Sequence, residues 1–276
     1  MNKGQLSNAL RKIGLLTPLD LLRFKLQRRR NKKINQHFTV ENPKVALPAD
    51  YLIYESFQMN YAKYYFGGKE AAAWVLSHIR KHKNLEGKRI LDWGCGPGRL
   101  IRHVPELLQY KSHVYATDYN EASIAWCKEH IVNVAFNQNR LAAKLPYKDH
   151  FFDAIYGISI FTHLSEEMHF NWLEELKRIL KPGGILFITT QGNNFKKKLS
   201  VSERNSFEKG ELIVRGNVKE GHRTFSAFHP DKFMRSLFEN SFQVIDKIVI
   251  SPKDKSYTPQ DAWILKKTQI TVTTHE

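Results

Sequence analysis

The feature that most constrains the fold is an alternation of short apolar runs with segments of helical period along the middle of the chain. In the helical segments, apolar residues recur every three or four positions, which is the spacing of one helix face. The predicted strands span residues 88–93, 113–117, 154–160 and 185–190, and the predicted helices span residues 69–82, 97–108, 121–130 and 165–180. Strands that alternate with helices form crossover units, so we predict a doubly wound α/β domain with a mostly parallel sheet and helices on both faces.

The C-terminal part of the chain predicts two more strands, in residues 241–250 and 261–267. Before them lies an irregular stretch, residues 191–229, which contains ELIVRGNV and HRTFSAFH. We expect this stretch to form a β-rich insertion on the substrate side of the domain.

The first 45 residues differ from the rest of the chain. Leucines recur at helical spacing in residues 5–16 and again in residues 19–30, and basic side chains crowd the end of the second segment. Asparagine and proline then break the pattern. We therefore predict a basic amphipathic helical extension over residues 1–45 and a main domain over residues 46–276.

The charge of the chain is strongly positive. Across 276 residues, 43 Lys and Arg outnumber 27 Asp and Glu, for a formal net charge of +16. The excess is concentrated in the N-terminal extension and in the cluster Lys196, Lys197 and Lys198. Such asymmetry indicates a polyanion, an anionic membrane surface or a charged substrate as partner, although a solvated face that aids solubility has the same pattern.

The cysteine count and the apolar runs indicate the compartment. Cys95 and Cys127 cannot build a disulfide framework, which favours a reducing environment. No apolar run is long enough to span a bilayer, and the N-terminus lacks the apolar core of a signal peptide. We expect a cytoplasmic enzyme, with the basic extension as a possible peripheral contact to the inner face of the membrane.

The stretch RILDWGCGPGRL, residues 89–100, lies where the first predicted strand ends. Glycines at such a strand end let the backbone turn sharply and approach a ligand closely. An acid precedes the first glycine, and a carboxylate there would repel a pyrophosphate, so Asp92 favours a cationic ligand that carries an ammonium and a sulfonium. Asp118 ends the second strand, where it is placed to accept hydrogen bonds from a ribose diol.

Four segments in this order resemble the class I S-adenosylmethionine-dependent methyltransferases: ILDWGCGPGRL, VYATDYN, LPYKDHFFDAIYGISIFTHL and LEELKRILKPGGILFITT. The resemblance implies a Rossmann-like, seven-stranded sheet, with S-adenosyl-L-methionine as the methyl donor and S-adenosyl-L-homocysteine as the product. More narrowly, FTHLSEE and AFHPDKFM resemble bacterial methyltransferases of glycan biosynthesis.

The same resemblance implies roles for individual residues around the cofactor. Those expected to line its methionine part are Asp92, Gly94, Cys95, Gly96, Gly157 and Ile158. Gly98 would permit close helix packing, Asp118 would take the ribose hydroxyls, and Tyr119 would lie against the adenine. The loop from Asn139 to Leu141 would contact the adenine edge, where the family often has an acid and NRLAAKLP has none.

The chemistry expected of such an enzyme is an in-line displacement, in which alignment of the acceptor supplies much of the acceleration. An oxygen acceptor also benefits from a general base, and histidine titrates in the useful range. His163 in IFTHL and His229 in AFHP are the two candidates; each would otherwise be a histidine hydrogen-bonded to a loop carbonyl. We predict no metal site.

The acceptor classes that these observations leave open are a small molecule, a glycan and a lipid-linked molecule, methylated on oxygen rather than nitrogen. The stretch after the fourth strand reads GISIFT, without the Asn/Asp-Pro-Pro-aromatic tetrapeptide of enzymes that methylate base amines. An RNA ribose hydroxyl stays open as an alternative that would use the basic surface. A non-catalytic S-adenosylmethionine-binding module is the other alternative.

Overall fold

The computed structural model describes residue 11, residues 14–252 and residues 257–268. The expected helix over residues 5–16 therefore lies almost wholly outside the described residues. Among the described residues, no helix is both long enough and apolar enough to cross a membrane.

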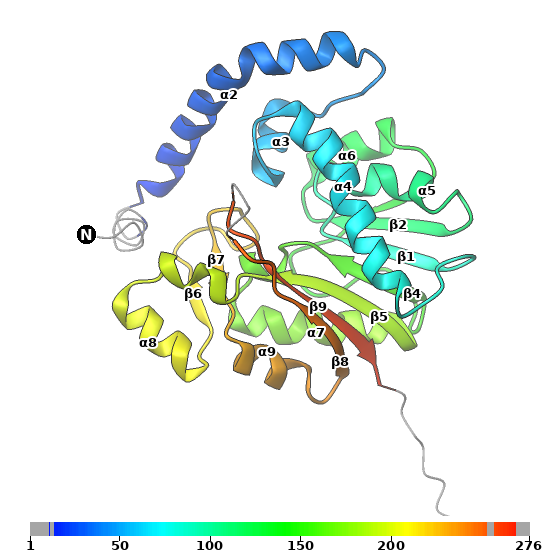
Figure 1. Cartoon of the computed structure of the whole chain (residues 1–276), viewed down its shortest axis with the longest axis vertical. Coiled ribbons are helices and arrows are strands. Elements are labelled where there is room, and N and C mark those ends of the chain that lie inside the picture. Colours follow the sequence, from blue (N-terminus) through cyan, green and yellow to red (C-terminus); the bar gives the residue numbers. More distant parts are fainter. Residues whose placement is uncertain (1–10, 12–13, 253–256, 269–276) are drawn as a thin grey trace, which may run out of the picture.

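A seven-stranded sheet forms the centre of the molecule, in the order β3-β2-β1-β4-β5-β9-β8 (Figure 1). Its strands are β1 (Arg89–Trp93), β2 (His113–Asp118), β3 (Ala135–Gln138), β4 (Phe152–Gly157), β5 (Leu180–Thr190), β8 (Phe242–Ile248) and β9 (Asp261–Lys267). The first five strands pair in parallel, and β9 runs antiparallel to both of its neighbours. The predicted doubly wound, mostly parallel sheet is confirmed.

Alternate side chains of the strands enter two separate cores, since successive residues of a strand point to opposite faces. Ile90 packs with the helices α4 (Tyr61–Arg80), α5 (Val104–Leu107) and α6 (Glu121–His130). Leu91 packs on the other face with α7 (Glu166–Ile179) and α9 (Asp231–Phe238). The predicted helices on both faces are therefore present.

The helix expected over residues 97–108 is interrupted. Residues 97–100 form turns, followed by the 3-10 turn η1 (Ile101–His103) and only then by α5. Gly98 has φ +85°, which no α-helix contains, and Pro105 lacks the N–H that a helix interior needs. Turns and a 3-10 turn thus take the place of the first part of the predicted helix.

The insertion over residues 191–229 is not mainly β-structure, which corrects the prediction. It contains the 3-10 helix η3 (Asn193–Lys198), the helix α8 (Val201–Lys209) and two short paired strands, β6 (Ile213–Arg215) and β7 (Ser226–Phe228). The helix begins at a capping box, in which Ser200 and Glu203 satisfy each other's backbone N–H groups, and ends at Gly210 with φ +94°.

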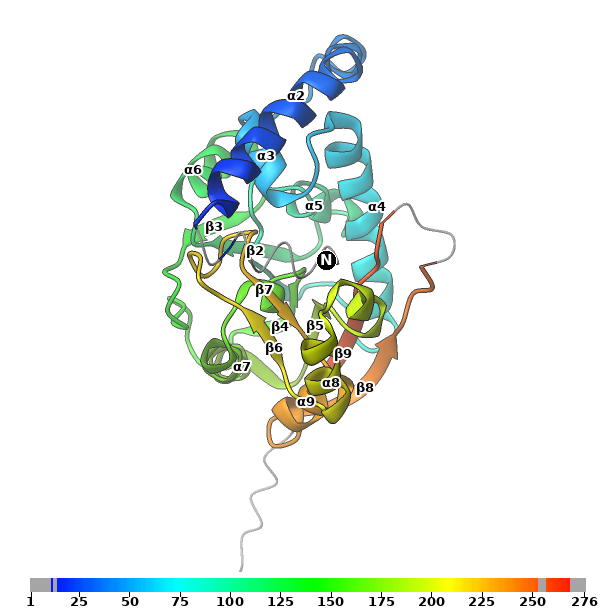
Figure 2. The same cartoon turned by 90° about the vertical axis from the view of Figure 1, so that its left-hand side faces the viewer.

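Two helices precede the domain's first strand and α4. The long helix α2 (Leu16–Glu41) lies along one side of the molecule, outside the layers around the sheet, and α3 (Asp50–Ser56) lies beneath it (Figures 1 and 2). The helix α2 ends at Glu41; the division into an extension over residues 1–45 and a main domain stays a prediction.

Candidate functional site

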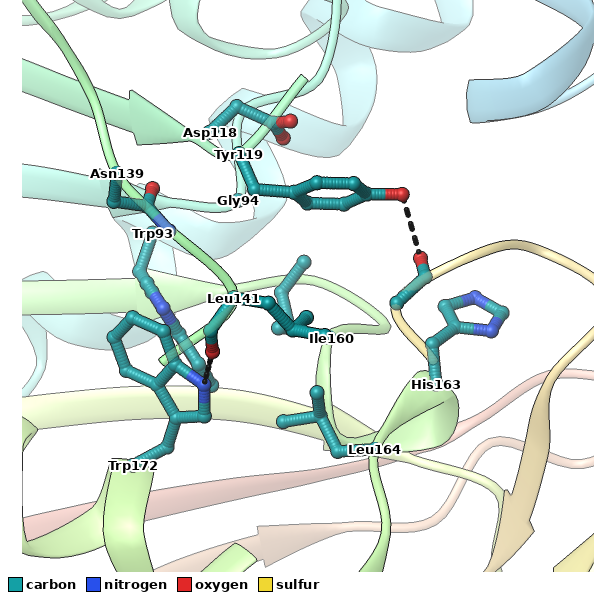
Figure 3. A pocket seen from close by; sticks show the side chains of 11 residues that line it. Trp93, Gly94, Asp118, Tyr119, Asn139, Leu141, Ile160, His163, Leu164 and Trp172 are labelled. Carbon is teal, nitrogen blue, oxygen red and sulfur yellow. Dashed lines mark hydrogen bonds between the residues drawn. The ribbon is translucent and has the colours of Figure 1, made fainter. Parts of the chain in front are cut away.

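A pocket opens at the carboxyl ends of the central strands (Figure 3). This is the edge at which ligands bind in doubly wound sheets. Its polar and backbone lining comes from Gly94, Asp118, Tyr119, Asn139, His163 and Gly221. Its apolar lining comes from Trp93, Leu141, Ile160, Leu164 and Trp172.

The glycine turn after β1 forms one wall of the pocket. Gly94 has φ +79°, and a Cβ on it would lie 2.1 Å from Cδ1 of Ile160, so only glycine fits there. The N–H groups of Gly94 and Cys95 both donate to the carbonyl oxygen of Thr117, at 2.8 and 2.9 Å. These bonds tie the turn to the end of β2 and fix its position.

Gly98 lies at the end of the turn that faces α6. A Cβ there would lie 2.4 Å from Cδ1 of Ile131 and 3.1 Å from Sγ of Cys127. This is the close helix packing expected of Gly98. Cys95 is buried, and burial raises its pKa, so it fills the turn as a small side chain.

Asp118 lies in the pocket wall with both carboxylate oxygens already held in place. Oδ2 accepts a hydrogen bond from Gly96 N–H and Oδ1 accepts one from Asn120 N–H, each 2.8 Å long. Burial raises the pKa of Asp118, and these two backbone bonds oppose that rise. A carboxylate has about four acceptor positions, so each oxygen can still accept a hydroxyl of a bound ribose.

Tyr119, Asn139 and Leu141 line the same end of the pocket. The Tyr119 hydroxyl donates to the carbonyl oxygen of Gly221 at 3.1 Å, and the Leu141 carbonyl accepts from Trp172 Nε1 at 3.2 Å (Figure 3). Oδ1 of Asn139 is buried, and it has no hydrogen-bond partner in the part of the chain that the structure describes. A buried amide oxygen without a partner at a pocket wall is suited to a donor on a ligand, such as an adenine amine.

Asp92 does not line the pocket, although the sequence predicted a direct cofactor contact. Its side chain is 3% exposed and accepts a hydrogen bond of 2.9 Å from the Tyr156 hydroxyl. Burial raises the pKa of Asp92 to about 7, with the Tyr156 bond opposing the rise. Asp92 therefore supports the end of β1 through Tyr156 rather than facing the pocket.

Gly157 and Ile158 also lie outside the pocket lining. A Cβ on Gly157 would lie 2.6 Å from the Trp93 ring, so this glycine makes room for the tryptophan. Ile158 packs against the core on the α4 side of the sheet. Instead, Ile160 lines the pocket; it comes slightly later in the loop after β4 and contacts Gly94.

His163 lines the pocket, as predicted, and its proton can be assigned from its partner. Nδ1 lies 2.8 Å from the carbonyl oxygen of Phe225. A carbonyl only accepts, so Nδ1 carries the proton in the neutral ring and Nε2 has a free lone pair. Burial lowers the pKa of His163 below 6.5, which favours this neutral form.

His229 is not part of the pocket lining. It is 1% exposed, and its Nε2 lies 2.9 Å from Nε2 of His169 on α7. His169 Nδ1 lies 2.6 Å from the Ser165 carbonyl and therefore donates to it, so His229 must donate to His169. The structure thus gives His229 a place in a buried histidine pair and leaves His163 as the histidine of the pocket.

Arg99 is a further candidate that the sequence analysis missed, although it directly follows the glycine motif. Its guanidinium stacks over the Phe57 ring with 4.6 Å between Cζ and the ring centroid. It forms no ion pair with a carboxylate of the described residues, and burial lowers its pKa to about 10. The charges of Tyr64 and Asp92 oppose this fall, so Asp92 is the carboxylate that interacts with Arg99 across the turn.

The loop between β6 and β7 forms a roof over the pocket. Gly221 lines it and holds Tyr119, His222 lies 3.1 Å from Glu55 of α3, and Arg223 forms an ion pair of 2.9 Å with Asp20 of α2. The loop therefore contacts the end of β2, α3 and α2, which come from distant parts of the chain.

Comparison with known proteins gives a matching family. Residues 90–184 match the family described as "Methyltransferase domain". The chain is 26% identical over 166 residues to the probable tRNA methyltransferase 9B of Mus musculus, covering 60% of this chain and 34% of that protein. It is 34% identical over 103 residues to the probable phthiotriol/phenolphthiotriol dimycocerosates methyltransferase 2 of Mycobacterium ulcerans, covering 37% of this chain and 38% of that protein.

A solved structure with the same fold is the 1,6-didemethyltoxoflavin-N1-methyltransferase of Burkholderia thailandensis, which holds 1,6-didemethyltoxoflavin and S-adenosylhomocysteine. The TM-score is 0.53 at 16% identity, covering 82% of this chain and 92% of that chain. The chain spans little more than a third of the length of the two curated relatives above.

Proposed function

We propose that this chain, whose residues 90–184 form a class I S-adenosylmethionine-dependent methyltransferase domain, transfers a methyl group to an oxygen atom of its acceptor. The observation that carries the proposal is the pocket at the carboxyl ends of β1, β2 and β4. It combines a glycine turn, a backbone-held acid, an unpartnered buried amide oxygen and a histidine with a free lone pair.

The pocket residues fit S-adenosylmethionine, which supplies an electrophilic methyl group on a sulfonium when it is bound. Gly94 lets the backbone approach the methionine part, and Asp118 accepts from the ribose hydroxyls. Tyr119 and Asn139 offer a ring face and an amide to the adenine. Arg99, directly after the turn, is the cation suited to the carboxylate of the methionine part, whereas Asp92 is buried outside the pocket lining.

His163 is suited to take the proton of an acceptor hydroxyl. The Phe225 carbonyl holds its Nδ1–H and so orients the ring, and burial keeps it neutral. A neutral Nε2 can accept the hydroxyl proton as the oxygen attacks; His163 then holds the proton as an imidazolium and releases it to solvent after the products leave. The apolar side chains Ile160, Leu164 and Trp172 limit water beside it.

For the acceptor we favour a small molecule, a glycan or a lipid-linked molecule over RNA. The support is that the stretch after β4 lacks the base-amine tetrapeptide and that the segments around His163 and His229 resemble glycan-pathway enzymes. A lipid-linked acceptor would place the enzyme at the cytoplasmic face of a membrane, and α2 is the described segment suited to that contact.

A methylated RNA ribose is the second candidate. The net charge of +16 favours it, as does the similarity to a probable tRNA methyltransferase. Phosphate contacts would make such binding fall steeply with salt.

The test begins with mass spectrometry of the purified protein for bound S-adenosylmethionine or its demethylated product. Titration calorimetry then measures cofactor affinity, and transfer of labelled methyl groups is followed on lipid-linked sugars, free glycans and RNA in parallel. Absence of cofactor binding would refute the proposal, and label in RNA alone would replace the favoured acceptor with the second candidate.

A further inference from the structure

The side of α2 that faces the rest of the protein is mostly polar. Its buried or half-buried residues recur every three or four positions, as Leu16, Asp20, Phe24, Gln27, Asn31, Asn35 and Phe38. The Asp20 carboxylate accepts from the Tyr54 hydroxyl at 2.8 Å and pairs with Arg223, and Asn35 Oδ1 accepts from the backbone N–H of Tyr61 at 3.0 Å. Polar bonds and two aromatic rings therefore hold this helix in place.

The opposite side of α2 is the one that carries the leucines. Leu15, Leu19, Leu22 and Leu26 follow a spacing of four, three and four residues, which places them on one stripe. They are 47%, 42%, 52% and 43% exposed. Because the helix is already fixed through its polar side, these leucines point away from the domain and are not part of its core.

Basic side chains surround the same stripe: Arg23, Lys25, Arg29, Arg30, Lys32 and Lys33. Within the part of the chain that the structure describes, none of these six forms an ion pair, whereas Arg28 pairs with Asp50. Arg23 of α2 also lies close enough to Lys198 of η3 to act on it: burial, Lys197, Arg215 and Arg23 together lower the pKa of Lys198. Two basic segments that are far apart in the sequence are thus neighbours.

We propose that the outward side of α2, residues 15–33, docks on an anionic lipid surface. Exposed leucines within a basic helix face combine the two contributions that hold a helix at a bilayer interface: apolar burial and attraction to acidic head groups. A second copy of the chain would bring two strongly positive faces together, which repel. RNA would use the cations and leave the leucines exposed to water.

The docking surface adjoins the roof of the pocket. Asp20 of α2 holds Arg223, and Gly221 in the same loop lines the pocket. A protein held at the bilayer through α2 would have its pocket close to the lipid surface, which suits a lipid-linked acceptor. Vesicle binding itself needs neither cofactor nor acceptor, so the docking and the proposed methyl transfer are separate claims.

The experiment is cosedimentation of the full chain with vesicles of phosphatidylcholine alone and of phosphatidylcholine mixed with phosphatidylglycerol, at low and high salt. The apolar variant is Leu19→Gln/Leu22→Gln/Leu26→Gln, and its control replaces exposed valines elsewhere, Val132→Gln/Val201→Gln/Val249→Gln. The charge variant is Arg29→Gln/Arg30→Gln/Lys33→Gln, and its control is Lys128→Gln/Lys144→Gln/Lys148→Gln.

We expect the full chain to sediment with the anionic vesicles and to be released by salt. The charge variant should bind about 100-fold more weakly, since each basic residue near the surface contributes about fivefold. The apolar variant should bind more than tenfold more weakly, and both controls should bind as the full chain does.

Three results would overturn the docking. They are no sedimentation with anionic vesicles at low salt, equal binding by the apolar variant and its control, and a dimer that becomes a monomer in the apolar variant. Calorimetry with S-adenosylmethionine is run on every variant; failure of the full chain to bind it refutes the proposed activity alone.

Discussion

The backbone N–H of Gly96 donates a hydrogen bond of 2.8 Å to the carboxylate of Asp118, so the turn after β1 and the end of β2 hold each other. The acid that faces the pocket is also the acid that fixes the glycine turn. Any change at Asp118 therefore acts on ligand contact and on turn geometry together.

Asp118→Ala should weaken S-adenosylmethionine binding about 10- to 100-fold, because hydrogen bonds to a charged group contribute about 1.5–3 kcal/mol. Asp118→Asn keeps one carbonyl oxygen for Gly96 and should weaken binding less. Calorimetry measures both, and thermal unfolding reports any loss of the turn. Unchanged affinity in Asp118→Ala would exclude Asp118 as the ribose acceptor.

Gly94→Ala should destabilise the protein more than Gly87→Ala, although both glycines have positive φ, +79° and +69°. An alanine costs about 1–2 kcal/mol in that conformation at either site. Only at Gly94 does the new Cβ meet Ile160, whereas nothing lies within 4 Å of a Cβ on Gly87. Chemical denaturation checks the difference, and the added change Ile160→Ala should recover part of the loss; equal destabilisation at both glycines would contradict the close contact.

His163→Ala should lower turnover by about 10²–10⁴-fold with the acceptor that the transfer screen identifies, while cofactor affinity stays near that of the unmodified protein. The pH profile gives a second readout. Burial lowers the pKa of His163, so the neutral base persists to lower pH than an ordinary histidine would. Turnover should fall only below pH 6.5; a fall that begins above this value, or normal turnover in His163→Ala, would assign the base elsewhere.

The buried pair His169 and His229 should make stability depend on pH. Burial lowers the pKa of His169 to about 4 and that of His229 well below 6.5. Above pH 6.5 the folded and unfolded chains both hold these rings neutral, so the full stability is present. As the pH falls from 6.5 towards 4, the unfolded chain takes up protons that the folded chain does not, and stability declines.

Replacing both members, in His169→Leu/His229→Leu, should remove much of that decline, which amounts to about 3 kcal/mol for His169 alone. Denaturant unfolding at pH 7, 6, 5 and 4 measures it. The control His37→Gln/His113→Gln alters two exposed histidines and should keep the original dependence of the unfolding free energy on pH. The same pH dependence in all three proteins would show that the pair does not titrate as proposed.

Much of the fold could be predicted from the sequence by itself. A helix or strand that buries one face has apolar residues at a regular spacing, and this spacing is visible within a short stretch of sequence. The helix α6 and the strand β9 have the predicted bounds, and the glycine motif lies at the end of β1, beside the pocket. Asp118, Tyr119, Asn139, Leu141 and His163 were all predicted for the site and all line it. β3 was missed because it is short and only one of its residues is buried.

Only the tertiary structure decided which side each motif residue faces. Asp92 and Gly157 belong to the motifs but pack against Tyr156 and Trp93, whereas Ile160 reaches the pocket because Gly94 leaves room for it. The leucines of α2 have the spacing of a buried stripe, yet they lie outward because Asp20 is held by Arg223 from far along the chain. Periodicity shows that a helix has an apolar side, but contacts between distant residues determine what, if anything, covers it.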